Sequence, residues 1–159
     1  MNILKKLSDI CKRFNENGVK YVIVGGCAVI LHGLPRTTQD IDIIIEISQE
    51  NIERIKNALK GLVSSGLDEL TYELVENYVT KKGVIRIGTD EGFYIDLIPK
   101  IGEITYEKVI KNAEKELIDD TIIIYAGLDD LIESKKTIRA QDEKDRIFLM
   151  GKKRFQSRT

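Results

Sequence analysis

Two aspartates, placed two residues apart inside an apolar strand, constrain this chain more than any other feature. Asp40 and Asp42 open a run in which every second residue from Ile41 to Ile47 is isoleucine. Successive residues of a strand point to opposite faces, so these isoleucines share a core-like face and the two carboxylates share the other. The carboxylates then lie roughly 6–7 Å apart along the strand, close enough to bind one or two hard cations if a third acid joins them.

Asp96 supplies a candidate third acid from a second apolar run, at 93–98. A carboxylate inside an apolar strand is costly when it is buried alone, so it must be solvated, paired or bound to a metal. If the two strands are neighbours in a sheet, Asp40, Asp42 and Asp96 converge on one point. Mg²⁺ or Mn²⁺ would relieve the mutual repulsion of their charges, so the spacing predicts a metal site with these three ligands.

A glycine pair stands between the first apolar strand, at 21–24, and the acidic strand. Gly25 and Gly26 are expected to turn the chain into a short helix that begins near Cys27. Such a turn lets bare backbone N–H groups and the positive end of a helix approach phosphate oxygens. The alternative is that the glycines only make a turn, but the aspartates downstream favour a phosphate-binding role.

The glycine pair, the triplet Asp40-Ile41-Asp42 and the distant triplet Ile95-Asp96-Leu97 together resemble the signature of the DNA polymerase β superfamily of nucleotidyltransferases. The string GGCAVILHGLPRTTQDIDI is similar to that of small nucleotidyltransferase-like proteins, whose members include phage-defence and toxin–antitoxin toxins. A later stretch looks like the helical segment that follows the core in those proteins, with Lys135, Arg139, Lys144 and Asp145.

The resemblance implies an α+β (α/β) fold, with a polymerase-β-like core of a mixed, twisted sheet flanked by helices and followed by C-terminal helices. It implies transfer of a nucleoside monophosphate from a nucleoside triphosphate to an acceptor hydroxyl, with Mg²⁺ or Mn²⁺ as cofactor. Asp40 and Asp42 would bind two ions, Asp96 would complete the second ion site and activate the acceptor, and Gly25 and Gly26 would hold the β- and γ-phosphates. The acceptor stays open between a protein, an RNA end and a small molecule, and a toxin-like role neutralised by a partner protein is a further expectation.

Other polar residues near these motifs have two interpretations each. Arg36 either pairs with triphosphate oxygens, which suit a guanidinium, or forms an ion pair that orients Asp40 or Asp42. Thr38 follows it in a segment that lies beside the active site in the resembled family, and it is counted among the nucleotide-binding residues. His32, the only histidine, is expected to be a structural hydrogen-bonding group, with a base or a metal ligand as the alternative.

Lys135 and Lys144 belong to the last two expected helices. They either reach nucleotide phosphates or lie on solvated helix faces.

Periodicity and turn residues predict the remaining elements. Helices are expected at about 4–14, 48–62, 67–76, 106–110, 128–138 and 141–150, and strands at 21–24, 40–47, 84–87, 93–98 and 121–125. The strands at 84–87 and 93–98 should form an antiparallel hairpin that places Asp96 next to the Asp40 strand, and 121–125 should lie at a sheet edge. Residues 1–150 are expected to form one domain, with a core at about 19–125 and C-terminal helices at about 127–150, and the basic stretch 151–159 is expected to be a flexible tail.

Composition limits the partners. The net charge is −1 and the pI is about 6.0, so no overall positive charge attracts nucleic acid. No apolar run approaches the ~20 residues needed to cross a bilayer, which predicts a cytoplasmic protein with no membrane partner. Cys11 and Cys27 stand in apolar surroundings that are typical of reduced, buried thiols.

Two other classes of function are carried as alternatives. A catalytically silent nucleotide-binding module predicts nucleotide affinity without product. A protein-interaction module, such as one half of a toxin–antitoxin pair, predicts no metal-dependent nucleotide binding. Homodimerisation through the C-terminal helices is a separate hypothesis, based on their apolar face beside a short edge strand.

Overall fold

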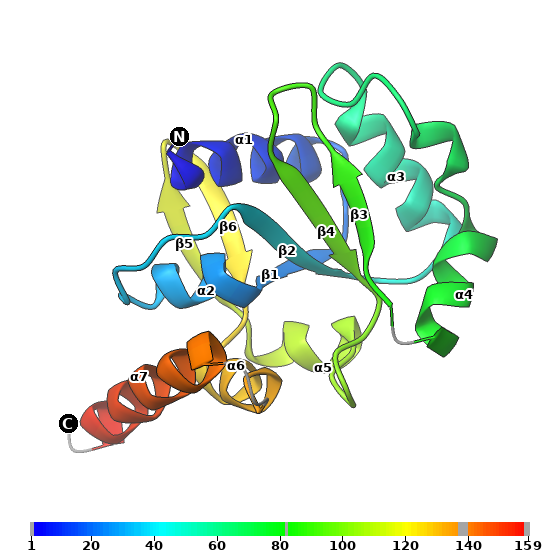
Figure 1. Ribbon diagram of the computed structural model, residues 1–159. Helices are drawn as coiled ribbons and strands as arrows, with labels where there is room; N and C mark the ends of the chain where they lie inside the picture. The colour runs from blue at the N-terminus through cyan, green and yellow to red at the C-terminus, as the bar shows by residue number, and fades with distance from the viewer. Residues whose placement is uncertain (1, 82, 137–139, 158–159) are drawn as a thin grey trace.

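A six-stranded mixed sheet forms the centre of the computed structural model, which describes residues 2–81, 83–136 and 140–157 (Figure 1). The strands are β1 (Tyr21–Val24), β2 (Asp40–Ile45), β3 (Ile85–Gly88), β4 (Tyr94–Ile98), β5 (Glu114–Ile118) and β6 (Thr121–Tyr125). Their order in the sheet is β3-β4-β2-β1-β6-β5. β2 is parallel to β4 and β1 is parallel to β6, whereas the other neighbours are antiparallel. The mixed sheet and the hairpin of β3 and β4 confirm the expectations from the sequence.

Helices flank this sheet. They are α1 (Ile3–Glu16), α2 (Gly25–Leu31), α3 (Gln49–Leu59), α4 (Tyr72–Lys81), α5 (Tyr106–Val109), α6 (Leu128–Ser134) and α7 (Ala140–Ser157), with short 3-10 helices η1 (Leu67–Glu69) and η2 (Ile110–Asn112). α1 packs against β6 and α3, α2 packs against β1 and β2, and α6 packs against α7. α7 extends away from the sheet toward the C-terminus (Figure 1). Within the described ranges, no helix combines the length and the apolar character that a membrane crossing requires.

Local sequence explains where the first helices begin and which face they bury. The Asn2 side chain accepts a hydrogen bond from the Leu4 backbone N–H at 3.1 Å, and the Ser48 hydroxyl accepts one from Asn51 N–H at 3.1 Å. Both contacts satisfy backbone donors that the first turn of a helix leaves free. α1 buries Leu7, Ile10, Cys11 and Phe14, which recur at helical spacing, and both cysteines are buried free thiols.

β2 is amphipathic only at its beginning. Asp40 and Asp42 are partly exposed, while Ile41, Ile43, Ile44 and Ile45 are at most 1% exposed. Ile44 shares a face with the two aspartates, so both faces of the strand are covered from Ile43 onward. Asp40 and Asp42 are therefore the side chains of β2 that are placed to meet a ligand.

β6 lies inside the sheet between β1 and β5, so its predicted position at the edge is wrong. The edge strand is β5, which the sequence analysis missed because its sequence, EKELI, begins with three charged residues. Charged side chains are typical of exposed edge strands, since they oppose pairing with another chain. Asp119 and Asp120, with φ of 48° and 64°, form the two-residue turn from β5 to β6, as in type I′ hairpins.

The two C-terminal helices have other bounds than expected. α6 ends at Ser134, and α7 continues to Ser157, so residues 151–157, which were expected to form a tail, are helical. Two lysines tie this turn of α7 to the rest of the molecule: Lys152 donates to the backbone oxygen of His32 at 2.8 Å, and Lys153 pairs with Asp129. These contacts act through charge, so the apolar periodicity of the sequence did not indicate them.

The helix expected at 67–76 is displaced along the chain. Only η1 forms at its start, and α4 begins at Tyr72. The Thr71 hydroxyl accepts a hydrogen bond from Leu74 N–H at 3.1 Å, which makes Thr71 the residue that caps the helix.

Candidate active site

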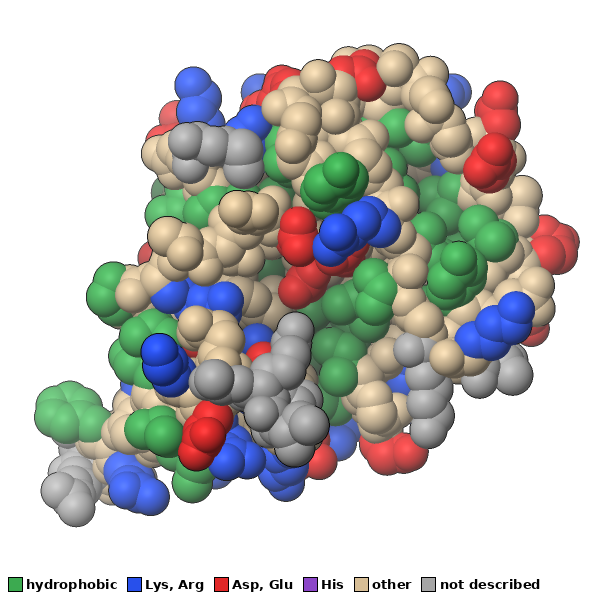
Figure 2. All heavy atoms as spheres, viewed as in Figure 1, with side chains coloured by type: hydrophobic (Ala, Val, Ile, Leu, Met, Phe, Trp, Pro, Cys, Tyr) green, Lys and Arg blue, Asp and Glu red, His purple; other side chains and the backbone are tan. Residues whose placement is uncertain are grey.

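The parallel register of β2 and β4 brings the three predicted carboxylates to one cavity. Asp42 lies directly beside Asp96, and Asp40 lies beside Tyr94. On the other side of β2, Asp42 lies beside Val24, the last residue before Gly25. The three carboxylates and Gly25 line a cavity of about 470 Å³. In the space-filling view, acidic and basic side chains meet over the strands at the middle of this face (Figure 2).

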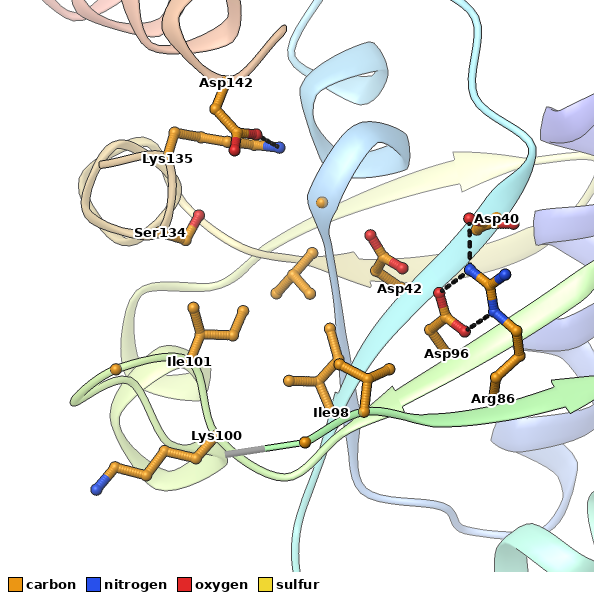
Figure 3. Close-up of a pocket in the computed structure, with 15 residues that line it drawn as sticks. Asp40, Asp42, Arg86, Asp96, Ile98, Lys100, Ile101, Ser134, Lys135 and Asp142 are labelled. Carbon is orange, nitrogen blue, oxygen red and sulfur yellow. Dashed lines mark hydrogen bonds and ion pairs between the residues drawn. The ribbon is translucent and has the colours of Figure 1, made fainter. Parts of the chain in front are cut away.

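Arg86 of β3 reaches over two of these carboxylates (Figure 3). Its Nε donates to Asp96 Oδ1 at 2.9 Å, and its Nη2 donates to Asp96 Oδ2 at 3.1 Å and to Asp40 Oδ2 at 2.9 Å. The guanidinium also lies 4.9 Å from the centre of the Tyr94 ring. Arg86 is not among the residues predicted from the sequence. The predicted hairpin held the signal, because its antiparallel register places Arg86 opposite Asp96.

Asp42 differs from the other two acids in its partners. It forms no ion pair with any residue in the described part of the chain. Burial, followed by the neighbouring charges of Asp96 and Asp40, raises the pKa of Asp42 to about 6. This carboxylate can therefore hold or release a proton near neutral pH.

The three carboxylates suit Mg²⁺ or Mn²⁺ in their chemistry, because hard divalent ions prefer clustered oxygen ligands. In the arrangement observed, however, no three acidic, histidine or cysteine side chains of the described residues surround one point as metal ligands. Figure 3 shows the Arg86 guanidinium bonded to both Asp40 and Asp96. The three carboxylates have the chemistry that a hard divalent ion prefers, and in this structure Arg86 pairs with two of them, Asp40 and Asp96.

The two glycines of the pair each allow a different close contact. Gly25 has φ of 65°, and a Cβ at this position would overlap the Asp42 carboxylate, so glycine is required for both the conformation and the space. A Cβ on Gly26 would lie 2.9 Å from Arg36 Nη1 and 3.0 Å from Thr38 Oγ1. Gly25 lines the cavity and Gly26 does not. Gly26 instead lets α2 pack closely against the segment that leads into β2.

A second cluster of charges lies across the cavity, on α6 and α7. Lys135 is 7% exposed, and its Nζ lies 3.2 Å from Asp142 Oδ1 and 3.2 Å from Asp145 Oδ2. Lys135 and Asp142 line the cavity wall opposite the three carboxylates (Figure 3). Lys135 is therefore not on a solvated helix face, which was one of its two interpretations.

Arg36 joins this second cluster. Its Nη1 donates to Asp145 Oδ2 at 2.8 Å. One interpretation had predicted an ion pair of Arg36 with Asp40 or Asp42, and the observed partner is Asp145 instead. Arg36 Nε is buried and has no hydrogen-bond partner among the described residues. Gln141 Nε2 donates to the other Asp145 oxygen at 2.8 Å, so Asp145 is enclosed by donors.

The remaining predicted residues lie outside the cavity or outside the described chain. Thr38 Oγ1 donates to the Asp40 backbone oxygen at 3.4 Å and lines a neighbouring hollow. Lys144 is exposed and does not line the cavity. Arg139 falls outside the described residues.

His32 is a structural residue, as its sequence context predicted. Its Nε2 lies 2.9 Å from the Ala126 backbone oxygen, and Lys152 Nζ lies 3.0 Å from Nδ1. Burial lowers the pKa of His32, so the ring is neutral, with Nε2 donating and Nδ1 accepting.

Comparisons with known proteins agree with this fold. A family described as "Nucleotidyltransferase of unknown function (DUF6036)" matches residues 2–93, a stretch that contains β1, α2 and β2. The gamma-glutamyl phosphate reductase of Caldicellulosiruptor saccharolyticus is 27% identical over 116 residues, which are 64% of this chain and 27% of that protein. The chain thus spans about a quarter of the length of this curated relative.

Two solved structures are similar. One is a candidate nucleotidyltransferase from Thermotoga maritima, with a TM-score of 0.59, 18% identity, and coverage of 83% of this chain and 81% of that one. The other is an antigenic nucleotidyltransferase-like protein from Paracoccidioides brasiliensis, with a TM-score of 0.54, 16% identity, and coverage of 92% and 74%. At these identities the likeness shows the fold alone.

Proposed function

The chain belongs to the family described as nucleotidyltransferases of unknown function, and from this premise we propose that it transfers a nucleoside monophosphate from a nucleoside triphosphate to an acceptor hydroxyl. The observation that supports this reaction best is the register of β2 and β4. It places Asp42 beside Asp96, two residues after Asp40, at the edge of a cavity that Gly25 also lines. Three carboxylates converging beside a close backbone turn suit phosphoryl chemistry better than a purely structural role.

In this proposal Asp40, Asp42 and Asp96 would hold the metal ions, and the complete site would contain two ions. When bound, Mg²⁺ or Mn²⁺ would neutralise the triphosphate oxygens and the leaving pyrophosphate. Gly25 would offer its backbone to the β- and γ-phosphates, because it has no side chain to keep them away.

The chemical step is an in-line displacement. The acceptor oxygen forms a bond to the α-phosphorus while the bond from that phosphorus to the bridging oxygen breaks, and pyrophosphate leaves with the bond's electron pair. The acceptor proton passes to the carboxylate of Asp96, which lies beside Asp42 in the sheet.

Lys135 is proposed as a phosphate ligand on the cavity wall opposite the three carboxylates. In the present arrangement its charge is shared with Asp142 and Asp145. Contact with a phosphate would need Lys135 Nζ to turn from these carboxylates into the cavity that it lines.

The biological setting is proposed from the resemblance. The acceptor would be a hydroxyl of a protein, an RNA end or a small molecule, and the resembled toxins favour a toxin-like role in the cytoplasm with a neutralising partner protein. A homodimer through α7 is supported by the exposed Ile147, Met150 and Phe155. Light scattering that gives only a monomer at high concentration would exclude this homodimer.

Thermal unfolding with each of the four nucleoside triphosphates, with and without Mg²⁺, tests the proposed activity. A ligand at 100 times its Kd stabilises the fold by about 2.7 kcal/mol, which is several degrees for a chain of this size. We expect a Mg²⁺-dependent shift with wild type, no shift with Asp42→Asn, and a wild-type shift with Asp68→Asn, which changes an exposed acid outside the cavity.

An α-³²P-labelled triphosphate then tests turnover. A labelled acceptor formed by wild type and not by Asp42→Asn is the expected result. A thermal shift without any labelled product would favour the catalytically silent nucleotide-binding module. No shift with any nucleotide would contradict the proposed function.

A further inference from the structure

Arg86 stands where the proposed site would be expected to accept a cation. Its three hydrogen bonds, between 2.9 and 3.1 Å, engage both oxygens of Asp96 and one oxygen of Asp40. Asp96 is nearly buried, with 9% of its side chain exposed, so its charge needs a partner in any state of the protein. A planar guanidinium with several donors meets this need, and it bridges two carboxylates as a divalent ion would.

The surroundings of the Arg86 side chain leave it room to move away from Asp40 and Asp96. Arg86 is 53% exposed, on a strand at the edge of the sheet, and besides the two carboxylates it contacts the face of the Tyr94 ring. It also lines both the active-site cavity and the hollow between β3 and α4, so open space lies on either side of it. Rotation of the side chain would expose Asp96 and Asp40 without any movement of the sheet.

We propose that Arg86 is the resident counter-ion of Asp40 and Asp96, and that it keeps a divalent ion out of this position until its guanidinium swings away. In the resting protein the site then takes one divalent ion at Asp42, the one carboxylate of the three that Arg86 does not contact. The second ion enters when Arg86 departs. This inference rests on the proposed function, because it assumes that the three carboxylates bind metal ions.

Titration of the full chain with Mn²⁺ tests the inference without any nucleotide or turnover. Free Mn²⁺ is measured by its electron paramagnetic resonance signal, which yields both the number of bound ions and their affinity. We expect wild type to bind one ion and Arg86→Gln to bind two, or to bind Mn²⁺ at least tenfold more tightly. Arg86→Lys keeps the positive charge and should stay close to wild type.

Arg54→Gln is the matched control. Arg54 is also a half-exposed arginine, at 42%, and it pairs with Glu50 on α3, outside the cavity. It should bind Mn²⁺ as wild type does. Thermal unfolding in a chelator checks the fold, and Arg86→Gln should unfold at a lower temperature than wild type and gain more from added Mn²⁺.

The outcomes separate this inference from the function on which it rests. If wild type binds Mn²⁺ and Arg86→Gln binds the same number of ions with the same affinity, the counter-ion role is overturned and the metal site stands. If neither wild type nor any Arg86 variant binds Mn²⁺, the metal site itself is overturned, and the inference with it. Binding that appears only in Arg86→Gln would support the counter-ion role of Arg86 and would overturn the one-ion site of the resting protein.

Discussion

Two clusters of charge face each other across the cavity, and they differ in balance and in exposure. The sheet cluster consists of Asp40, Asp42, Asp96 and Arg86, so three carboxylates share one guanidinium that is 53% exposed. The helix cluster consists of Lys135, Arg36, Asp142 and Asp145. Among the described residues it pairs two cations with two carboxylates, and none of these four side chains is more than 17% exposed.

The difference between the clusters indicates different tasks. A balanced, buried network can hold elements together, because removing any member leaves an uncompensated charge away from water. The helix cluster joins α6 and α7 to the segment before β2 in this way. An unbalanced, open cluster keeps negative charge in excess, which suits it to bind cations. We therefore expect stability to depend on the helix cluster and activity to depend on the sheet cluster.

The largest expected effect is on the helix cluster. Asp145→Asn removes the charge that both Lys135 and Arg36 contact, and we expect the free energy of unfolding to fall by about 3–5 kcal/mol, since a buried pair loses one partner. Urea denaturation followed by circular dichroism measures it, with Asp68→Asn as the exposed control. A loss below about 1 kcal/mol would show that the cluster does not hold the helices.

The next effect is on the turn that meets the sheet cluster. Gly25→Ala places a Cβ against the Asp42 carboxylate and strains a residue with φ of 65°, so we expect a loss of about 2–4 kcal/mol. Gly61→Ala is a matched control, because Gly61 has φ of 86° and nothing within 4 Å of the added Cβ. The difference between the two losses measures the overlap with Asp42. Equal losses in both variants would mean that the turn and Asp42 are not in contact.

Asp42→Asn should stabilise the fold while it abolishes activity. The pKa of Asp42, about 6, lies above its ordinary value of 3.8, so the folded protein holds this proton more tightly than the unfolded chain. The free energy of unfolding then falls as pH rises from about 4 to about 6, and above this range the folded protein bears the full cost of the charged Asp42 carboxylate. We expect the variant to gain roughly 1–3 kcal/mol at pH 7.5 without metal.

Urea denaturation between pH 4 and pH 8 checks this sign. The stability difference between Asp42→Asn and wild type should be near zero at pH 4 and should grow up to about pH 6. A variant that is less stable than wild type at pH 7.5 would mean that Asp42 has a compensating partner, which contradicts the picture of an unbalanced cluster.

The smallest expected effect is at Lys144, which belongs to neither cluster. Lys144→Ala should change the free energy of unfolding by less than about 0.5 kcal/mol, as is usual for exposed residues. It should also leave the nucleotide-dependent thermal shift of wild type unchanged. Loss of that shift would return Lys144 to the nucleotide site predicted from the sequence.

The sequence alone predicted the sheet cluster better than the helix cluster. A carboxylate in an apolar strand stands out locally, so Asp40, Asp42 and Asp96 were recognisable from alternation and from their resemblance to a known signature. Asp145 and Lys135 lie on helices that carry many charges, and nothing local separates a buried charge from a solvated one. Arg36 was recognised as important, but its partner was not.

What the sequence determined by itself is the set of elements that form the candidate site: the strands expected at 21–24, 40–47 and 93–98, the glycine turn, and the three acids. These follow from short-range rules, namely the period of a strand and the conformational freedom of glycine. Only the tertiary structure decided that β5 takes the sheet edge, that Asp145 receives both Arg36 and Lys135, and that Arg86 covers Asp40 and Asp96. Each of these outcomes pairs groups across long separations in the chain or across a strand register. Coulomb attraction and burial select such partners only after the sheet has formed.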